Sequence, residues 1–345
     1  MAISLRVHTV DYSLGFLAIK MFKSFFLVGG AGFIGSHFVD ALLQRDSVHA
    51  VTIYDNFSTG KEWHYQHQRH DGRLSIIRGE ITSSSQLTEA MRGHDVAMHF
   101  ASNADISKAI NEPSIDFIEG ISLTQQVLES ARLSGIKRII YTSGSGVYGD
   151  MGELACAEDQ GDMQPISTYG ASKLAGEAFI ASYCHMFGMT ACVFRFANVV
   201  GPRQTHGVGY DFVNSLFNNT STLRILGNGS QSKSYIYVED IVNAVLLANE
   251  KMQRPYEVYN VATGDYITVY EIATIIVKSM ALENQVAFEF TGGDRGWQGD
   301  VPIVRLKTDK IRALGWRCQY NSAQSISKSA LALIAHVREN VITTC

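Results

Sequence analysis

Residues 25–39 read FFLVGGAGFIGSHFV, an apolar run that leads into glycines 29, 32 and 35 and then into a second apolar pattern. The first run is typical of a buried parallel strand and the second of a helix. Glycines at this spacing let the backbone turn tightly, let a pyrophosphate approach the amino end of the helix, and let helix and strand pack closely. The stretch therefore predicts a strand, turn and helix that bind a dinucleotide.

A carboxylate at the end of the next predicted strand supports this interpretation. Residues 53–61 read IYDNFSTGK and place Asp55 twenty residues after Gly35. A carboxylate at this distance accepts hydrogen bonds from the adenosine ribose and repels a 2′-phosphate. The two motifs together predict NAD, in preference to NADP, as the cofactor.

Strand and helix patterns alternate along the first two thirds of the chain. Further strand-like runs rich in β-branched or aromatic residues lie at 50–54, 74–77, 96–100, 138–141 and 190–195. Helical patterns lie between them at 36–43, 122–133 and 169–187. This alternation predicts an α/β fold with a doubly wound, parallel, Rossmann-type sheet, followed by a smaller C-terminal substrate-binding region.

The same pattern suggests how the chain is divided. We expect an NAD-binding domain over 21–195, with 236–264 returning to it, and a substrate-binding region formed by 196–235 and 265–345. Residues 1–20 lack the cleavage site of a signal peptide and are expected to be an extension outside the core, with Met21 as a possible natural start.

Composition excludes several other classes of function. The net charge of −4 gives no general basic surface, so neither nucleic acid nor an anionic membrane is expected as the main partner. The five cysteines are odd in number and scattered without a C-x-x-C motif. They fit free thiols in a reducing cytoplasm, and no metal site is expected.

Tyr169 and Lys173, in the segment STYGASKLAGE at 167–177, are the candidate catalytic pair. Their spacing of four residues places both side chains on one face of the predicted helix. A phenol titrates near pH 10, and a neighbouring ammonium together with an oxidised nicotinamide favours the phenolate. Tyr169 is therefore expected to act as a general base near neutral pH.

The glycine spacing with its GAGFIG core resembles the extended short-chain dehydrogenase/reductase family, and the resemblance covers nearly the whole chain from residue 21. Further matching segments are GEI at 79–81, HFAS at 99–102, RFANVVGPRQ at 195–204, GNGSQSKSYIYVEDI at 227–241 and YNVATGDYITVYEI at 259–272. Within the family the chain is most similar to the NAD-dependent nucleotide-sugar epimerases and dehydratases, above all to the UDP-glucose (UDP-galactose) 4-epimerases.

The resemblance implies a set of roles. Tyr169 would take the proton of the sugar 4-hydroxyl, and Lys173 would hold the nicotinamide ribose and depress the tyrosine pKa. Asn198 would bind the substrate near its diphosphate. The implied cofactor-binding residues are Gly29, Gly32, Phe33, Ile34, Gly35, Asp55, Asn56, Ser58, Gly60, Glu80, Ile81, Phe100, Ala101, Ser102, Tyr169 and Lys173. The substrate would be a nucleotide-diphosphate sugar, most commonly a UDP-sugar, and the helices at 122–133 and 169–187 would form a homodimer interface.

Three departures from the family pattern concern ligand binding. Lys233 replaces an arginine, which keeps a charge for phosphate but loses the bidentate fork. Trp297 occupies a position that often holds a diphosphate-binding arginine; Arg295 could replace it, or could equally be an ordinary surface arginine. Gly120 replaces an asparagine that lies near the nicotinamide in relatives, and so removes one side-chain contact.

The fourth departure concerns the chemistry. In YTSGSGVYG at 141–149, the catalytic serine or threonine of the family falls on Gly144. We expect Ser145 to substitute for it, with Ser143 as the second candidate and a water molecule as the third.

The same stretch discriminates between reactions. Dehydratases carry Asp-Glu where this chain has Ser145 and Gly146, and decarboxylases usually keep the glutamate. The sequence therefore favours C4 epimerisation through a 4-keto intermediate. The alternatives are a lyase on the same class of substrate and a non-catalytic protein that binds NAD or a sugar nucleotide.

Overall fold

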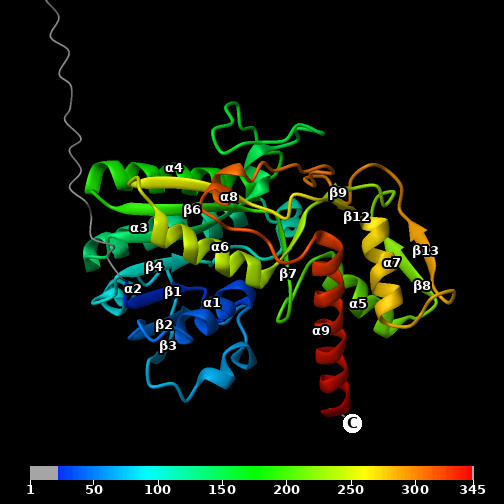
Figure 1. Cartoon of the computed structure of the whole chain (residues 1–345), viewed down its shortest axis with the longest axis horizontal. Coiled ribbons are helices and arrows are strands. Elements are labelled where there is room, and N and C mark those ends of the chain that lie inside the picture. The colour runs from blue at the N-terminus through cyan, green and yellow to red at the C-terminus, as the bar shows by residue number, and fades with distance from the viewer. Residues whose placement is uncertain (1–21, 344–345) are drawn as a thin grey trace, which may run out of the picture.

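A seven-stranded parallel sheet forms the centre of the molecule (Figure 1). The computed structural model describes residues 22–343, so the predicted extension 1–20, Met21 and Cys345 lie outside the described residues. The strand order is β11-β6-β5-β4-β1-β2-β3. The strands are β1 (Ser24–Val28), β2 (Ala50–Asp55), β3 (Leu74–Arg78), β4 (Val96–His99), β5 (Arg138–Gly144), β6 (Thr190–Phe196) and β11 (Tyr256–Val261). This order reverses direction beside β1, which confirms the predicted doubly wound fold.

Helices cover both faces of the sheet (Figure 1). One face carries α1 (Phe33–Leu43) and α6 (Val238–Lys251), and the other carries α2 (Ser84–Met91), α3 (Leu123–Ser134) and α4 (Thr168–Phe187). Successive side chains of a strand point to opposite faces. Accordingly, Leu27 belongs to the core under α1, and Phe26 and Val28 belong to the core under α3 and α4.

A smaller lobe lies at one end of the sheet and has its own apolar core (Figure 1). Its helices are α5 (Val208–Asn218), α7 (Val269–Ser279) and α9 (Ser322–Thr343), with β8 (Thr222–Ile225) pairing with β13 (Ala287–Phe290). Short pairs join β7 (Asn198–Val200) to β10 (Tyr235–Tyr237) and β9 (Ser232–Lys233) to β12 (Ile267–Thr268). The short α8 (Asp309–Ala313) lies between β13 and α9 in the sequence.

Short helical turns connect the longer elements near the carboxyl edge of the sheet. A π-helical turn, Phe117–Ser122, precedes α3, and a 3₁₀ turn, Ser145–Tyr148, follows β5. Further 3₁₀ turns are Glu62–His64, Gln66–Gln68 and Ile106–Ile110. Over the described residues, the structure has no helix with the length and apolar character that crossing a membrane requires.

Candidate active site

The glycine loop after β1 is shaped first by contacts within the protein. Gly29 has φ +80°, and a Cβ there would lie 2.7 Å from the backbone nitrogen of Ala101. At Gly35 a Cβ would lie 2.5 Å from the carbonyl oxygen of Gly29. Both positions exclude a side chain, because it would collide with the backbone of the loop or of the segment after β4.

Gly32 differs from its two neighbours in this respect. It caps α1 with φ −73°, a conformation open to any residue, and a Cβ there would meet only the Gly29 carbonyl oxygen, at 3.3 Å. Packing within the protein therefore hardly requires glycine at this position. A bare backbone at the amino end of a helix is the surface on which a dinucleotide pyrophosphate fits, so these residues suit NAD.

Asp55 ends β2 and supports the same loop. One carboxylate oxygen accepts a hydrogen bond from the backbone nitrogen of Ala31 (3.0 Å), and the other accepts one from Phe57 (2.8 Å). Burial raises the pKa of this carboxyl group, although the two backbone donors act against that effect. The acid is therefore held at the edge of the glycine loop.

The other predicted cofactor residues lie where β2, β3 and β4 end. Asn56 donates to the Glu80 carboxylate (3.2 Å) and accepts from the Ser58 backbone (3.0 Å). A Cβ at Gly60 would lie 2.9 Å from Ala31, so this residue also adjoins the glycine loop. Phe33 and Ile34 begin α1, Ile81 is buried after β3, and Phe100, Ala101 and Ser102 follow β4.

Tyr169 and Lys173 lie one turn apart on α4, facing the end of β5. The Lys173 ammonium is 5.4 Å from the centre of the Tyr169 ring and donates to the Thr142 carbonyl oxygen at 2.9 Å. The Ser167 side chain caps the helix by accepting from the Gly170 backbone (3.1 Å). The structure thus brings the predicted pair together at the edge where ligands bind in such sheets.

Burial dominates the electrostatics of the pair. It raises the pKa of Tyr169 to about 12, with the Ser102 hydroxyl acting in the opposite direction. Burial also lowers the pKa of Lys173 to about 8, while Asp116 and Glu177 favour its charged form. The joint effect of the ammonium and an oxidised nicotinamide on the tyrosine pKa stays a prediction for the enzyme with NAD bound.

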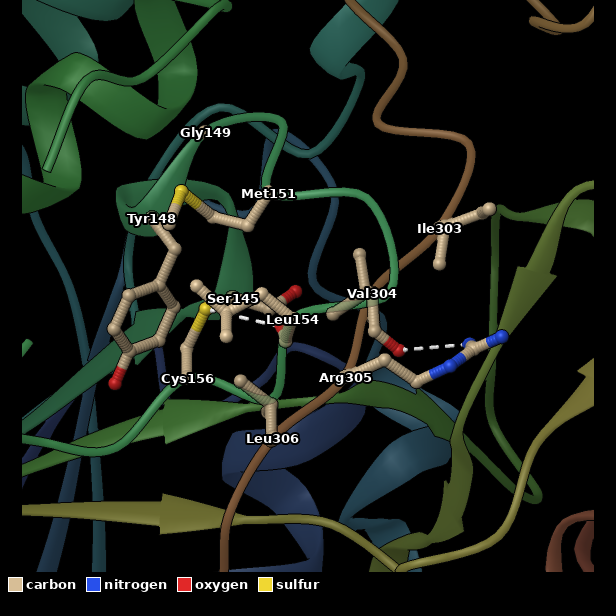
Figure 2. A pocket seen from close by; sticks show the side chains of 10 residues that line it. All are labelled: Ser145, Tyr148, Gly149, Met151, Leu154, Cys156, Ile303, Val304, Arg305 and Leu306. Carbon is tan, nitrogen blue, oxygen red and sulfur yellow. Dashed lines mark hydrogen bonds between the residues drawn. The ribbon is translucent and has the colours of Figure 1, made fainter.

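The two serines beside Gly144 have different surroundings. Ser143 is buried and donates to the Glu177 carboxylate at 2.6 Å. Figure 2 shows Ser145 among the side chains of a pocket that also includes Cys156 and Leu306. This pocket has a volume of about 10 Å³, which is about the space that one water molecule needs. It is too small for a sugar ring.

The predicted substrate residues lie in and beside the smaller lobe. Lys233 forms an ion pair with Asp300 at 2.5 Å, and Arg295 donates to the Asp300 carbonyl oxygen at 2.7 Å. Arg295 also pairs with Asp150 at 2.6 Å. Asn198 begins β7, where its amide donates weakly to the Ser234 carbonyl oxygen (3.4 Å). Lys233 and Arg295 are therefore neighbours around one aspartate.

Gly120 lies against α4 and not against open space. A Cβ there would be 2.6 Å from the Ser172 Cβ and would contact the Ser172 hydroxyl more closely still. An asparagine at this position could not be accommodated unless Ser172 moved. The departure at Gly120 is thus coupled to Ser172, whose hydroxyl donates to the Tyr169 carbonyl oxygen at 2.8 Å.

Comparison with known proteins agrees with this geometry. A model of the NAD-dependent epimerase/dehydratase family matches residues 25–262, more than half of the chain. The chain belongs to this family. Its cofactor is NAD, and it is an enzyme of the nucleotide-sugar epimerase/dehydratase type.

Individual members of the epimerase/dehydratase family span several reactions. A UDP-galactose 4-epimerase structure is 34% identical with a TM-score of 0.80, over 91% of this chain and 99% of that one. A dTDP-glucose 4,6-dehydratase from Streptomyces venezuelae, with NAD bound, is 26% identical with a TM-score of 0.83, over 92% and 97%. A UDP-N-acetyl-α-D-glucosaminuronate decarboxylase from Bacillus cytotoxicus is 32% identical over 73% of this chain and 79% of its own.

Sequence reasoning missed the acids of this epimerase/dehydratase site. Glu177, Asp116, Asp150 and Asp300 each bind a residue that the sequence singled out or that lies next to one. One signal was available: Glu177 follows Lys173 by four residues and so shares its helix face. The aspartates come from distant segments, and no local pattern marks them.

Proposed function

We propose that the protein catalyses NAD-dependent epimerisation at C4 of a nucleotide-diphosphate sugar, a UDP-hexose or UDP-hexuronic acid, through a transient 4-keto intermediate. The observation that carries this proposal is the composition of the turn after β5. Residues 144–146 are Gly, Ser and Gly, so the turn beside Tyr169 offers no carboxylate for eliminating water. Epimerisation requires only one acid–base group, which Tyr169 provides.

Tyr169 is the proposed general base and acid. Its phenolate takes the proton of the sugar 4-hydroxyl as C4 is oxidised. The phenol returns that proton to the 4-oxygen after the keto sugar has rotated in the site. When bound, NAD would supply reversible hydride transfer at C4. Lys173, fixed by the Thr142 carbonyl oxygen, holds the nicotinamide ribose and keeps a positive charge beside the phenolate.

We propose the glycine loop, Asp55 and the residues around Glu80 and Phe100 as the cofactor site. Gly32 leaves its backbone bare for the pyrophosphate, and Asp55 lies beside the loop for the ribose. Lys233 and Arg295 would meet the diphosphate of the sugar nucleotide, with Asn198 nearby. Lys233 and Arg295 form ion pairs with Asp300 and Asp150 in the described structure. A bound diphosphate would replace these carboxylates as the partner of the two cations.

The competing reaction is a lyase reaction on the same substrates. Relatives include a dehydratase and a decarboxylase, so similarity alone does not choose between the reactions. Two nearby buried acids already have partners: Glu177 is paired with Arg195 at 2.7 Å, and Asp116 accepts hydrogen bonds from Asn103 and Thr168. These contacts favour epimerisation.

A substrate panel tests the proposal. The protein with NAD would be incubated with UDP-glucose, UDP-N-acetylglucosamine and UDP-glucuronic acid, and the C4 configuration would be followed by NMR. We expect inversion at C4 for at least one sugar, and no inversion for the Tyr169→Phe variant. Release of water or carbon dioxide would establish the lyase instead, and binding without turnover would favour a non-catalytic protein.

We also propose a homodimer formed through α4 and the segment before α3. Large apolar side chains are exposed there: Phe117 is 62% exposed and Met186 69%, and Ile118 and Phe179 are also exposed. A second copy of the chain would cover them. Sedimentation should give twice the monomer mass, and Phe179→Glu should shift the protein toward monomer.

The division into domains and the cytoplasmic location remain predictions.

A further inference from the structure

Gly144 stands at the end of β5 between two serines whose surroundings differ. The Ser143 hydroxyl is used by Glu177, and Ser145 lines the small pocket of Figure 2. Gly144 itself has an ordinary extended conformation, and a Cβ built on it would meet no atom within 4 Å. The position of the missing hydroxyl is thus open, and its function must come from elsewhere.

Ser102 lies on the neighbouring strand end. It follows β4, which pairs in parallel with β5, so both segments emerge at the same edge of the sheet. The Ser102 hydroxyl lies close enough to the Tyr169 phenol to lower its pKa, although no hydrogen bond of standard geometry joins the two groups in the described structure.

Asp116 joins the residues that adjoin Ser102 and Tyr169. One carboxylate oxygen accepts from the Asn103 amide at 2.9 Å, and the other accepts from the Thr168 hydroxyl at 2.6 Å. Asn103 directly follows Ser102, and Thr168 directly precedes Tyr169. Asp116 is 1% exposed and Asn103 5%, whereas Thr168 is exposed, so the Asn103 side of this clamp is shielded from water. It fixes two backbone segments that lie far apart in the sequence.

We propose that Ser102 supplies the hydroxyl assistance that Gly144 cannot, and that Asp116 is the positioning residue that holds Ser102 opposite Tyr169. This inference rests on the proposed function. In the reacting state the Ser102 hydroxyl donates a hydrogen bond to the phenolate oxygen and keeps its proton. The bond from the sugar 4-oxygen to its hydrogen breaks, the phenol O–H bond forms, and the hydride leaves C4 for NAD.

The first test removes the hydroxyl and then restores it on the other strand. Ser102→Ala should lower kcat at least about tenfold with little change in KM, because a hydrogen bond to the transition state is lost. Adding Gly144→Ser to that variant should recover much of the turnover, since the open position accepts the side chain. Ser182→Ala, on the exposed side of the same helix as Tyr169, is the matched control.

The second test measures the pKa of the Tyr169 phenol directly and does not require a sugar substrate. The protein with NAD bound would be titrated with base, and the phenolate absorbance of Tyr169 would be obtained by subtracting the titration of the Tyr169→Phe variant. Ser102→Ala should raise the pKa of Tyr169, because a donor to the phenolate is removed.

Asp116→Asn tests the clamp through kcat. It should lower kcat when Ser102 is present and should have little further effect in Ser102→Ala, because the clamp acts through Ser102. Loss of the carboxylate charge favours a lower pKa of Tyr169 and Lys173 in both backgrounds, so the comparison between the backgrounds isolates the effect of position. The other titratable groups beside this pair, Glu177, His99 and Tyr141, are unchanged in these variants.

The outcomes separate the two proposals. A protein that inverts no sugar but whose Tyr169 pKa rises in Ser102→Ala would contradict the proposed function and support the role of Ser102. Full turnover and an unshifted phenol in Ser102→Ala would overturn the inference, even if C4 epimerisation were established. Loss of turnover without a titration shift and without rescue by Gly144→Ser would also overturn it, since the loss would then be structural.

Discussion

The hydroxyl of Ser143 donates a 2.6 Å hydrogen bond to the carboxylate of Glu177, behind the strand end that faces the catalytic pair. The same carboxylate is paired with Arg195 at 2.7 Å, and the side chains of both partners are less than 5% exposed. A buried ion pair depends on such additional donors to satisfy its oxygens. Ser143 therefore belongs to the support of α4.

Replacing Ser143 by alanine should affect stability more than chemistry. We expect the free energy of unfolding to fall by about 1–3 kcal/mol, because a buried carboxylate loses a donor. Turnover at saturating substrate should stay within roughly threefold of the parent, as for a residue that makes no transition-state contact. Urea unfolding and steady-state kinetics would measure the two effects. Loss of kcat in a variant of unchanged stability would instead identify Ser143 as catalytic.

Activity should stop rising on the alkaline side as Lys173 loses its proton. Burial raises the pKa of Tyr169 to about 12 and lowers that of Lys173 to about 8, so the lysine is charged below pH 8 and loses its charge as the pH rises through that value. Because Tyr169 must lose a proton while Lys173 keeps one, kcat/KM of the free enzyme should rise with pH up to about 8 and then level off. A profile that kept rising to pH 10 would show that the charge on Lys173 is not required.

Alanine at Gly32 should separate cofactor binding from folding. The added Cβ meets little of the protein, so the melting temperature should change little, whereas NAD affinity should fall at least about tenfold. Gly29→Ala is the contrasting variant, because its Cβ would collide with the Ala101 backbone and should destabilise the fold itself. Calorimetric titration with NAD and thermal unfolding would measure both variants. Unchanged affinity in Gly32→Ala would argue against a pyrophosphate at this position.

Replacing Asp300 by asparagine should strengthen binding of the diphosphate. The carboxylate neutralises Lys233, and both groups are mostly buried, so solvent screens the pair only in part. We expect a several-fold lower Kd for UDP and a steeper dependence of that Kd on salt. The Lys233→Met/Asp300→Asn double variant is the control and should lose this gain. Weaker UDP binding in Asp300→Asn alone would mean that the aspartate orders the site.

Periodic patterns in the sequence predicted most of the fold. The predicted strands at 25–28, 50–54, 74–77, 96–100, 138–141 and 190–195 each lie within or one residue beyond an observed strand of the main sheet. Except for the edge strand β3, these strands are largely buried and therefore form nearly continuous apolar runs. The π-helical turn before α3, in which Gly120 approaches Ser172, was not predicted, because no sequence period marks either feature.

The candidate site could be predicted only where its residues lie close together in the sequence. Tyr169 and Lys173 share a helix face, and Gly32 and Asp55 belong to one strand–helix–strand unit. Asp116 and Thr168, by contrast, are 52 residues apart and meet through folding. The partners of Lys233 and Arg295 are likewise set by tertiary contacts. Local motifs therefore identify Lys233 and Arg295 but do not predict which carboxylates neutralise their charges.

The close approach of Gly120 to Ser172 also couples two positions that are distant in the sequence. An asparagine at position 120 would collide with Ser172, and loss of the Ser172 side chain would leave a gap beside the helix that carries Tyr169. Neither position can change alone without cost to the fold. A substitution at either position is therefore tolerated best when the other changes with it.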